Sequence, residues 1–216
     1  MRLRPESRFA DRAAAGGELG RLAAAADLSD PLVLGLARGG VPVAAEVARM
    51  VGAPLDVFVV RKIGAPGSPE LGVGAIAEGG EPVFDADLLG RLRLTPDLLA
   101  GTLERERAEL ARRVRHYRGD RALALAGRQV VLVDDGLATG GSARAALRAL
   151  RAHGVERLLF GVPVGPPSTL AALRAEADVV VAVLRPERLS SVGEWYDDFG
   201  QVSDETVLAL LAELRG

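Results

Sequence analysis

The sequence predicts an α/β fold in which a parallel, twisted sheet is flanked by helices. Short runs rich in valine and leucine alternate along the chain with segments of helical pattern. The runs are continuously apolar, which is typical of strands that are covered on both faces. With 216 residues, of which 49% are hydrophobic, the chain has the length of one domain, 1–216, built around one core.

Five apolar runs are predicted to be strands, and two segments between them are predicted to be crossover helices. The strands are expected at 31–36, 55–60, 129–133, 157–164 and 178–184. One helix is expected at 41–51, with Pro42 in its first turn, and the other at 141–153, followed by Gly154. The order of strand, helix and strand implies right-handed parallel connections. Ligands of such sheets bind beyond the carboxyl ends of the strands, so those loops are the first candidates for a site.

Two segments outside these elements are marked by turn residues or by aromatic residues. Residues 64–80 are rich in glycine and proline, and they are predicted to form a mobile loop with a short strand or hairpin near 73–77. Residues 185–203 contain the only tryptophan and precede a final helix that is expected to begin near Ser203.

Residues 85–125 are predicted to be a helical insertion, whose main helix runs over 95–118 with an apolar stripe along one side. Arginines in this helix alternate with glutamates, and Glu109 is placed to pair with Arg113. The pattern favours a solvated or dimer-contacting helix over a nucleic-acid site.

The composition excludes several kinds of site. No apolar run reaches the roughly 18 residues that a membrane-spanning helix needs, and the N-terminus lacks the apolar stretch of a secretory signal, so we expect a cytoplasmic protein without a membrane partner. The chain has no cysteine, and its two histidines, His116 and His153, cannot alone form a transition-metal site. Any metal must therefore be bound by oxygen. A net charge of −2 gives no reason to expect a nucleic-acid partner.

The segment that carries the most chemical information is VVLVDDGLATGGS, residues 130–142. An apolar strand leads into two adjacent carboxylates, Asp134 and Asp135, and then into a short turn that opens a helix. Unpaired N–H groups at a helix N-terminus bind phosphate, and Gly140 and Gly141 let the backbone curl around it. The carboxylates beside that turn are placed to accept hydrogen bonds from a vicinal diol such as ribose. The pattern therefore predicts a site for a sugar phosphate.

This stretch resembles, nearly position for position, the signature of the type I phosphoribosyltransferases. The resemblance implies that Asp134 and Asp135 hold the ribose 2′ and 3′ hydroxyls, partly through Mg²⁺. It also implies which residues bind the 5′-phosphate: Ala138, Thr139, Gly140, Gly141 and Ser142. One departure is Gly136, where the family usually has an apolar residue, and this change removes no ligand.

The resemblance extends to the loop after the first strand. The segment 36–40 looks like the family's pyrophosphate loop, in which backbone amides and one basic side chain meet the leaving group. The basic side chain would be Arg38, and the backbone would be that of Ala37, Gly39 and Gly40.

After the second strand, Arg61 and Lys62 are similar to the basic pair at the root of the family's flexible loop. Residues 64–80 have the composition of a lid that closes during turnover. Lys62 is the only lysine in the chain, and a genomic bias toward arginine does not explain why it is kept.

The resemblance implies a phosphoribosyltransferase that binds 5-phosphoribosyl-1-pyrophosphate and Mg²⁺ and transfers the ribose phosphate to a nitrogen acceptor. Arg38 and Lys62 would neutralise the departing pyrophosphate together with Mg²⁺. Glu70 or Glu78 is the candidate general acid or base in the loop. The family's habit implies a homodimer with small-molecule substrates.

The family also has a variable hood that covers the acceptor base. The candidate hood is SVGEWYDDF, whose aromatic residues are Trp195, Tyr196 and Phe199. Trp195 and Tyr196 are as typical of core packing as of stacking on a base. The sequence does not specify the acceptor.

Several alternatives remain. A regulatory module would bind the same ligand without transferring anything. An NADP-dependent reductase is suggested by a loose dinucleotide fingerprint over 35–40, with Arg61 placed to meet a 2′-phosphate. Receiver-type signalling domains also have a strand that ends in two aspartates. For Arg38, Arg61 and Lys62, the alternative to a binding role is that they are ordinary solvated residues at strand ends.

Overall fold

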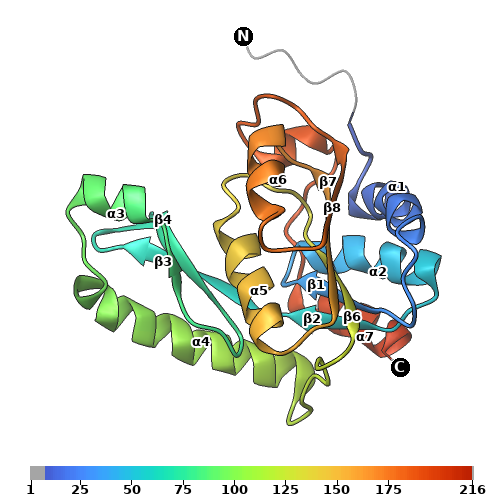
Figure 1. Ribbon diagram of the computed structural model, residues 1–216, viewed down its shortest axis with the longest axis horizontal. Helices are drawn as coiled ribbons and strands as arrows, with labels where there is room; N and C mark the ends of the chain where they lie inside the picture. Colours follow the sequence, from blue (N-terminus) through green and yellow to red (C-terminus); the bar gives the residue numbers. More distant parts are fainter. Residues whose placement is uncertain (1–7, 216) are drawn as a thin grey trace.

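The computed structural model describes residues 8–215, which contain a five-stranded parallel sheet and a three-stranded antiparallel sheet (Figure 1). The order of the parallel strands is β2-β1-β6-β7-β8. Their bounds are β1 Leu32–Leu36, β2 Leu55–Phe58, β6 Gln129–Val133, β7 Arg157–Val164 and β8 Val179–Leu184. Each strand lies on a segment that the sequence predicts to be a strand, so the parallel α/β prediction is confirmed.

Helices cover both faces of the parallel sheet, which explains why its strands are apolar throughout. One face is covered by α5 Gly141–Ala152 and α6 Pro167–Leu173. The other face is covered by α1 Arg12–Ala24, α2 Gly40–Val51 and α7 Asp204–Leu214. Successive residues of β1 alternate between the two cores: Val33 packs with α2 and Leu34 with α5.

The sequence did not predict α1 or α6. Helix α1 packs on its neighbours largely through alanines and glycines, so it lacks the stripe of large apolar residues by which helices are recognised. Its Gly20 lies so close to α2 that a Cβ atom there would be 2.9 Å from Cβ of Met50.

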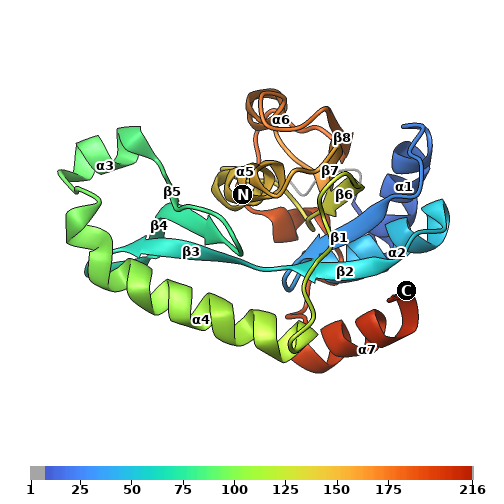
Figure 2. The ribbon, with the colours of Figure 1, turned by 60° about the horizontal axis from the view of Figure 1, so that its bottom comes forward.

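The antiparallel sheet forms an arm that extends from the parallel sheet. Figure 2 shows β2 continuing into the arm as β3, and α4 running along the arm and ending beside α7. The elements of the arm are β3 Val60–Ala65, β4 Ser68–Ala77, β5 Val83–Phe84, α3 Ala86–Leu92, the 3₁₀ turn Asp97–Leu99 and α4 Ala100–Arg118. They enclose a small core around Ile63, Val73 and Leu99.

Two predictions for this region need correction. The strand predicted at 55–60 is divided at Val59, whose carbonyl oxygen accepts a hydrogen bond from Glu78 N at 3.0 Å. The loop predicted at 64–80 is mostly strand, and its turn is at Pro66 and Gly67. The glycine at 64 allows a close contact between strands, since a Cβ atom there would be 2.4 Å from the carbonyl oxygen of Pro69.

The other predicted helices are found close to their expected positions. Helix α4 begins at Ala100, a few residues later than predicted, because a 3₁₀ turn precedes it. The predicted pair forms, with Arg113 Nε 2.8 Å from Glu109 Oε1. Helix α7 begins after Ser203, near the predicted position, and the side chain of Ser203 caps it. Within residues 8–215, no helix combines the length and apolar character needed to cross a bilayer.

Candidate active site

A cleft of ≈ 1150 Å³ lies at the carboxyl ends of β1 and β6 and is lined by residues of both sheets. Most of the predicted site residues line it: Ala37, Arg38, Gly39, Arg61, Lys62, Glu70, Asp134, Asp135, Ala138, Thr139, Gly140, Gly141, Ser142 and Phe199. Four of the predicted residues do not line it, namely Gly40, Glu78, Trp195 and Tyr196. The fold therefore brings together loops that lie far apart in the sequence.

The turn 138–142 opens α5 at the edge of the cleft. Gly140 is the N-cap, with φ 80° and ψ 1°, a left-handed conformation that favours glycine. Among residues 8–215, no side chain caps the first N–H groups of α5. Thr169 Oγ1 donates to the carbonyl oxygen of Ala138 at 3.1 Å and steadies the turn. The free amides and the helix dipole make this turn suited to an anion such as a phosphate group.

The two aspartates follow β6 directly beside this turn. The backbone N–H of Asp135 donates to Asp134 Oδ1 at 2.9 Å. Burial, and then the neighbouring charge of Asp135, raise the pKa of Asp134 well above its usual range. Burial also raises the pKa of Asp135, while Arg12 opposes this shift. A cation or hydroxyl donors beside these two buried carboxylates would stabilise their ionised forms.

Arg12 is a residue of the cleft that sequence reasoning missed. Its Nε and Nη2 atoms both lie 3.0 Å from Asp135 Oδ2, and its Nη1 atom donates to the carbonyl oxygen of Gly200 at 2.8 Å. Its guanidinium carbon is 3.9 Å from the centre of the Phe199 ring. Arg12 lies in the first turn of α1, far from any strand end, so no motif in the sequence points to it.

The loop after β1 packs directly on the aspartates. A Cβ atom at Gly39 would be 2.1 Å from Asp135 Oδ2, and one at Gly40 would be 2.6 Å from the carbonyl oxygen of Val133. Only glycines permit this approach. Gly40 is buried beneath the cleft, so its role is to let the two loops meet. The peptide bond between Ala37 and Arg38 is cis.

The predicted hood is only partly placed as expected. Phe199 lines the cleft, but Tyr196 is 2% exposed, with ring-centre distances of 5.4 Å to Phe9 and 4.9 Å to Phe199. Its hydroxyl donates to the carbonyl oxygen of Asp135 at 2.6 Å. Trp195 packs against the same cluster. Tyr196 is thus buried in the packing cluster beside the site, Trp195 is half-buried against it, and neither lines the cleft, so of the two interpretations this structure shows core packing.

The departure at Gly136 has a local explanation. A Cβ atom there would be 2.3 Å from Cγ1 of Val192. Val192 is the first residue of the short 3₁₀ turn Val192–Trp195, and it also lines the cleft. An apolar side chain from another segment thus occupies the space beside the aspartates.

Helix α4 forms a wall of the cleft that the sequence did not predict. Thr102, Arg105, Glu106 and Arg113 of this helix line the cleft. Arg105 and Glu106 follow Thr102 by three and four residues, and Arg113 follows them by eight and seven, so the four side chains lie on one side of the helix, and this was the available signal. Arg61 Nε donates to Glu106 Oε2 at 2.8 Å, which joins β3 to α4. Helix α4 is therefore more than a solvent-exposed helix, because one of its sides lines the cleft.

The other predicted charged residues differ in their positions. The charge of Lys62 lowers the pKa of both Asp134 and Asp135, so it lies near them. Glu70 lines the cleft from β4. Glu78 does not line it; instead it is 7% exposed and paired with Arg118. Glu78 therefore lies outside the cleft in which a general acid or base would act.

The aspartate pair fits an oxygen-bound metal that is shared with a substrate. Within residues 8–215, no group of three or more His, Cys, Asp or Glu side chains is placed to hold a metal ion. Mg²⁺ commonly takes one or two carboxylates and completes its shell with water and substrate oxygens. Asp134 and Asp135 match that donor set.

Comparisons with known proteins agree on one family. The family model for the phosphoribosyl transferase domain matches residues 10–193. Two Mycobacterium tuberculosis proteins, from strains H37Rv and CDC 1551 / Oshkosh, are named putative phosphoribosyl transferases and are each 43% identical over 204 residues. The match covers 94% of this chain and 46% of theirs, so the chain spans about half the length of these relatives.

A solved structure is similar over the whole fold. The crystal structure of TT1426 from Thermus thermophilus is 46% identical, with a TM-score of 0.79. The match covers 97% of this chain and 100% of that protein.

Proposed function

Because the chain belongs to the phosphoribosyl transferase domain family, we propose that it binds 5-phosphoribosyl-1-pyrophosphate with Mg²⁺ and transfers the ribose phosphate to a nitrogen acceptor. One observation carries the proposal. The anion-binding turn at 138–142, the aspartate pair and the basic residues Arg38 and Lys62 all line a single cleft. A phosphorylated sugar with a second, larger anionic group matches these three features. Its phosphate fits the turn, its hydroxyls fit the aspartates, and its larger anionic group fits the basic residues.

In the proposed complex, the amides of 138–142 hold the 5′-phosphate and the aspartates hold the ribose hydroxyls. Arg38, Arg61 and Lys62, with the backbone at Ala37 and Gly39, face the pyrophosphate. Asp134 and Asp135, together with substrate oxygens, would hold Mg²⁺, and the bound ion would supply positive charge near the pyrophosphate. Arg12 keeps Asp135 oriented through the two contacts described above.

The proposed reaction is a displacement at the anomeric carbon. The bond from that carbon to the pyrophosphate oxygen breaks, and its electron pair leaves with pyrophosphate. An acceptor nitrogen donates its electron pair to the same carbon and loses a proton. Glu70, which lines the cleft from β4, is the proposed acceptor of that proton. The protein contributes mainly by positioning the reactants and neutralising the leaving group.

The proposal is tested by measuring pyrophosphate release from 5-phosphoribosyl-1-pyrophosphate and Mg²⁺ with a panel of nitrogenous bases. Binding of the sugar is measured in parallel by titration calorimetry. We expect Asp134→Asn with Asp135→Asn to weaken binding at least about tenfold, since charged hydrogen bonds are lost. Asp30→Asn is the matched control, because Asp30 is exposed and pairs only loosely with Arg128, at 3.9 Å.

The possible outcomes separate the candidate functions. Release of pyrophosphate with at least one base supports the transferase. Binding of the sugar without turnover on any base indicates a regulatory module. Absence of binding by the wild-type protein contradicts both.

A further inference from the structure

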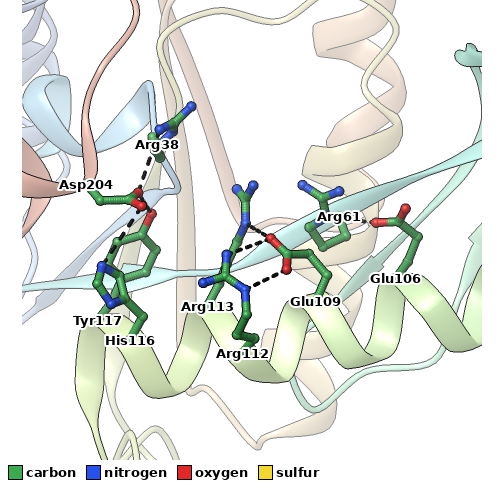
Figure 3. Close-up of polar contacts among 9 residues, drawn as sticks. All are labelled: Arg38, Arg61, Glu106, Glu109, Arg112, Arg113, His116, Tyr117 and Asp204. Carbon is green, nitrogen blue, oxygen red and sulfur yellow. Dashed lines mark hydrogen bonds and ion pairs between the residues drawn. The ribbon is translucent and has the colours of Figure 1, made fainter.

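Three arginines that line the cleft are each paired with one carboxylate (Figure 3). The pairs are Arg38 with Asp204, Arg61 with Glu106 and Arg113 with Glu109. Arg61 and Arg113 each donate from Nε at 2.8 Å. Within residues 8–215, the Nη atoms of these two arginines make no hydrogen bond. Each guanidinium group therefore keeps one edge available for a second anion.

The free edges have a common orientation. In Figure 3 the terminal nitrogens of Arg61 and Arg113 point away from α4, toward the side on which Arg38 lies. The side chains of Arg38, Arg61 and Arg113 are 29%, 27% and 24% exposed, so they are partly withdrawn from bulk solvent. Charge interactions are stronger in such a place than on an open surface.

Arg38 and Arg113 line the same cleft from different segments, the loop after β1 and helix α4. Tyr117 donates a hydrogen bond that lowers the pKa of Asp204, and the charges of Arg38 and Arg113 act in the same direction. The positive charges of Arg38 and Arg113 therefore both act on Asp204, although only Arg38 pairs with it, at 3.7 Å.

The carboxylate behind Arg113 is itself held in place. Glu109 accepts hydrogen bonds from Arg112 Nε at 2.7 Å and Arg112 Nη2 at 2.9 Å, besides the one from Arg113. The hydrogen bonds from Arg112 and Arg113 lower the pKa of Glu109 to about 2. Glu109 therefore stays ionised at neutral pH and fixes the guanidinium plane of Arg113.

We propose that Arg113, supplied by the inserted helix, binds the departing pyrophosphate together with Arg38 and Arg61, and that Glu109 is a positioning residue for it. This inference rests on the proposed function. The 5′-phosphate is not the partner of Arg113, because the turn 138–142 provides a separate site for it at the start of α5. The planar fork of an arginine matches phosphate oxygens in pairs.

The chemical role of Arg113 follows from the negative charge that develops on the departing pyrophosphate. As the bond to the anomeric carbon breaks, its electron pair stays on the pyrophosphate oxygen. An arginine that is already oriented stabilises this charge without reorganising. The inserted helix then serves as a fixed wall of the leaving-group site.

The test compares two probes, pyrophosphate with Mg²⁺ and ribose 5-phosphate, by titration calorimetry. We expect Arg113→Gln to weaken pyrophosphate binding about ten- to hundredfold, the range for losing a hydrogen bond between charged groups, and to leave ribose 5-phosphate unchanged. Arg107→Gln is the matched control, because Arg107 lies on the same helix, is 44% exposed, pairs with Glu104 and does not line the cleft. Glu109→Gln should weaken pyrophosphate binding by less than Arg113→Gln and spare ribose 5-phosphate.

Several outcomes of these binding measurements would contradict the inference about Arg113. The inference is overturned if Arg113→Gln binds pyrophosphate as tightly as the wild type, or if it loses both probes equally. It is also overturned if the wild type binds ribose 5-phosphate but not pyrophosphate. If the wild type binds neither probe, nor 5-phosphoribosyl-1-pyrophosphate, the proposed function fails and the inference with it.

Discussion

Asp135 is contacted by three segments that lie far from it in the sequence. Its carboxylate receives two contacts from Arg12, its carbonyl oxygen accepts from the Tyr196 hydroxyl, and the loop at Gly39 packs against its side chain. These partners lie 123, 61 and 96 positions away along the chain. The orientation of one predicted site residue therefore depends on three distant segments.

Replacing Arg12 should weaken this arrangement. We expect Arg12→Gln to lower the free energy of unfolding by about 1–3 kcal/mol, because a partly buried carboxylate loses its charged partner. Sugar-phosphate binding should weaken as well. Urea denaturation and calorimetry measure the two effects.

Arg8→Gln is the control for this prediction. Arg8 pairs with Asp197, whose side chain is 57% exposed, so its loss should cost less than about 1 kcal/mol. Equal destabilisation by the two variants would argue against a special role for Arg12.

Glu78 illustrates a charge that serves the fold and not the cleft. It lies at the junction of the arm and the parallel sheet, where Arg118 Nη1 donates to its Oε1 at 3.2 Å. Burial raises the pKa of Glu78 from 4.5 to about 7, although the charge of Arg118 opposes this shift. Folding therefore favours the protonated form of Glu78.

This shift predicts how stability depends on pH. The pKa of Glu78 is higher in the folded protein than in the unfolded chain, so its contribution is complete below about pH 4.5 and is lost as the pH rises to about 7. Across that window, the wild type should lose up to about 3 kcal/mol relative to Glu78→Gln. Denaturation curves at several pH values measure the difference. A wild type that gains stability over Glu78→Gln as the pH rises would contradict the prediction and show that the ion pair dominates.

At the scale of elements, the start of α5 combines a conformational requirement with a binding function. Gly140 adopts φ 80°, and a Cβ atom there would be 3.0 Å from Cγ2 of Thr169. Gly141 is the first residue of the helix, and a Cβ atom there would meet no heavy atom within 4 Å. The two adjacent glycines thus have different reasons to be present.

We expect Gly140→Ala to destabilise the protein by roughly 1–2 kcal/mol, the cost of a left-handed conformation for a residue with a Cβ atom. Gly141→Ala should change stability by less than about 1 kcal/mol, or increase it slightly, because alanine suits a helix better than glycine. Thermal unfolding of the two variants distinguishes them. A similar loss of stability in both variants would show that steric space, and not backbone conformation, decides which residues this turn accepts.

At the scale of the whole molecule, the cleft lies where the arm meets the parallel sheet. The parallel sheet is covered on both faces by two extensive cores. The arm has its own smaller core, which contains six buried residues among those the structure describes. The arm nonetheless contributes to the cleft: its strands supply Arg61, Lys62 and Glu70, and its helix α4 supplies Arg113.

The difference in core size predicts a difference in local stability. Amides of β3 and β4 beyond Ile63 should exchange with deuterium faster than those of β1, β6 and β7, because less apolar surface is buried around them. Hydrogen exchange followed by mass spectrometry measures this. Binding of 5-phosphoribosyl-1-pyrophosphate should slow exchange in the arm if Lys62 contacts the ligand. Equal protection of the arm and the parallel sheet would contradict the prediction.

The parts of this architecture that could be predicted have local causes. The strands of the parallel sheet are buried on both faces, so each one is a continuous apolar run. The residues at the ends of β1 and β6 could be predicted as candidates because parallel strands present their carboxyl ends at one edge. The loop prediction for segment 64–80 was wrong because Gly64 and Gly74 allow close contact between strands, which the composition does not distinguish from flexibility.

The parallel α/β core, the turn that opens α5 and the pair of aspartates beside it could be predicted from the amino-acid sequence, because each depends on residues adjacent in the chain. Three features are visible only in the folded chain: Arg12 contacts Asp135, the Tyr196 hydroxyl bonds to the backbone of Asp135, and Arg113 lines the cleft. Those positions depend on how α1, the C-terminal segment and α4 pack on the sheet. Packing of distant segments is set by the whole fold, and no local pattern records it.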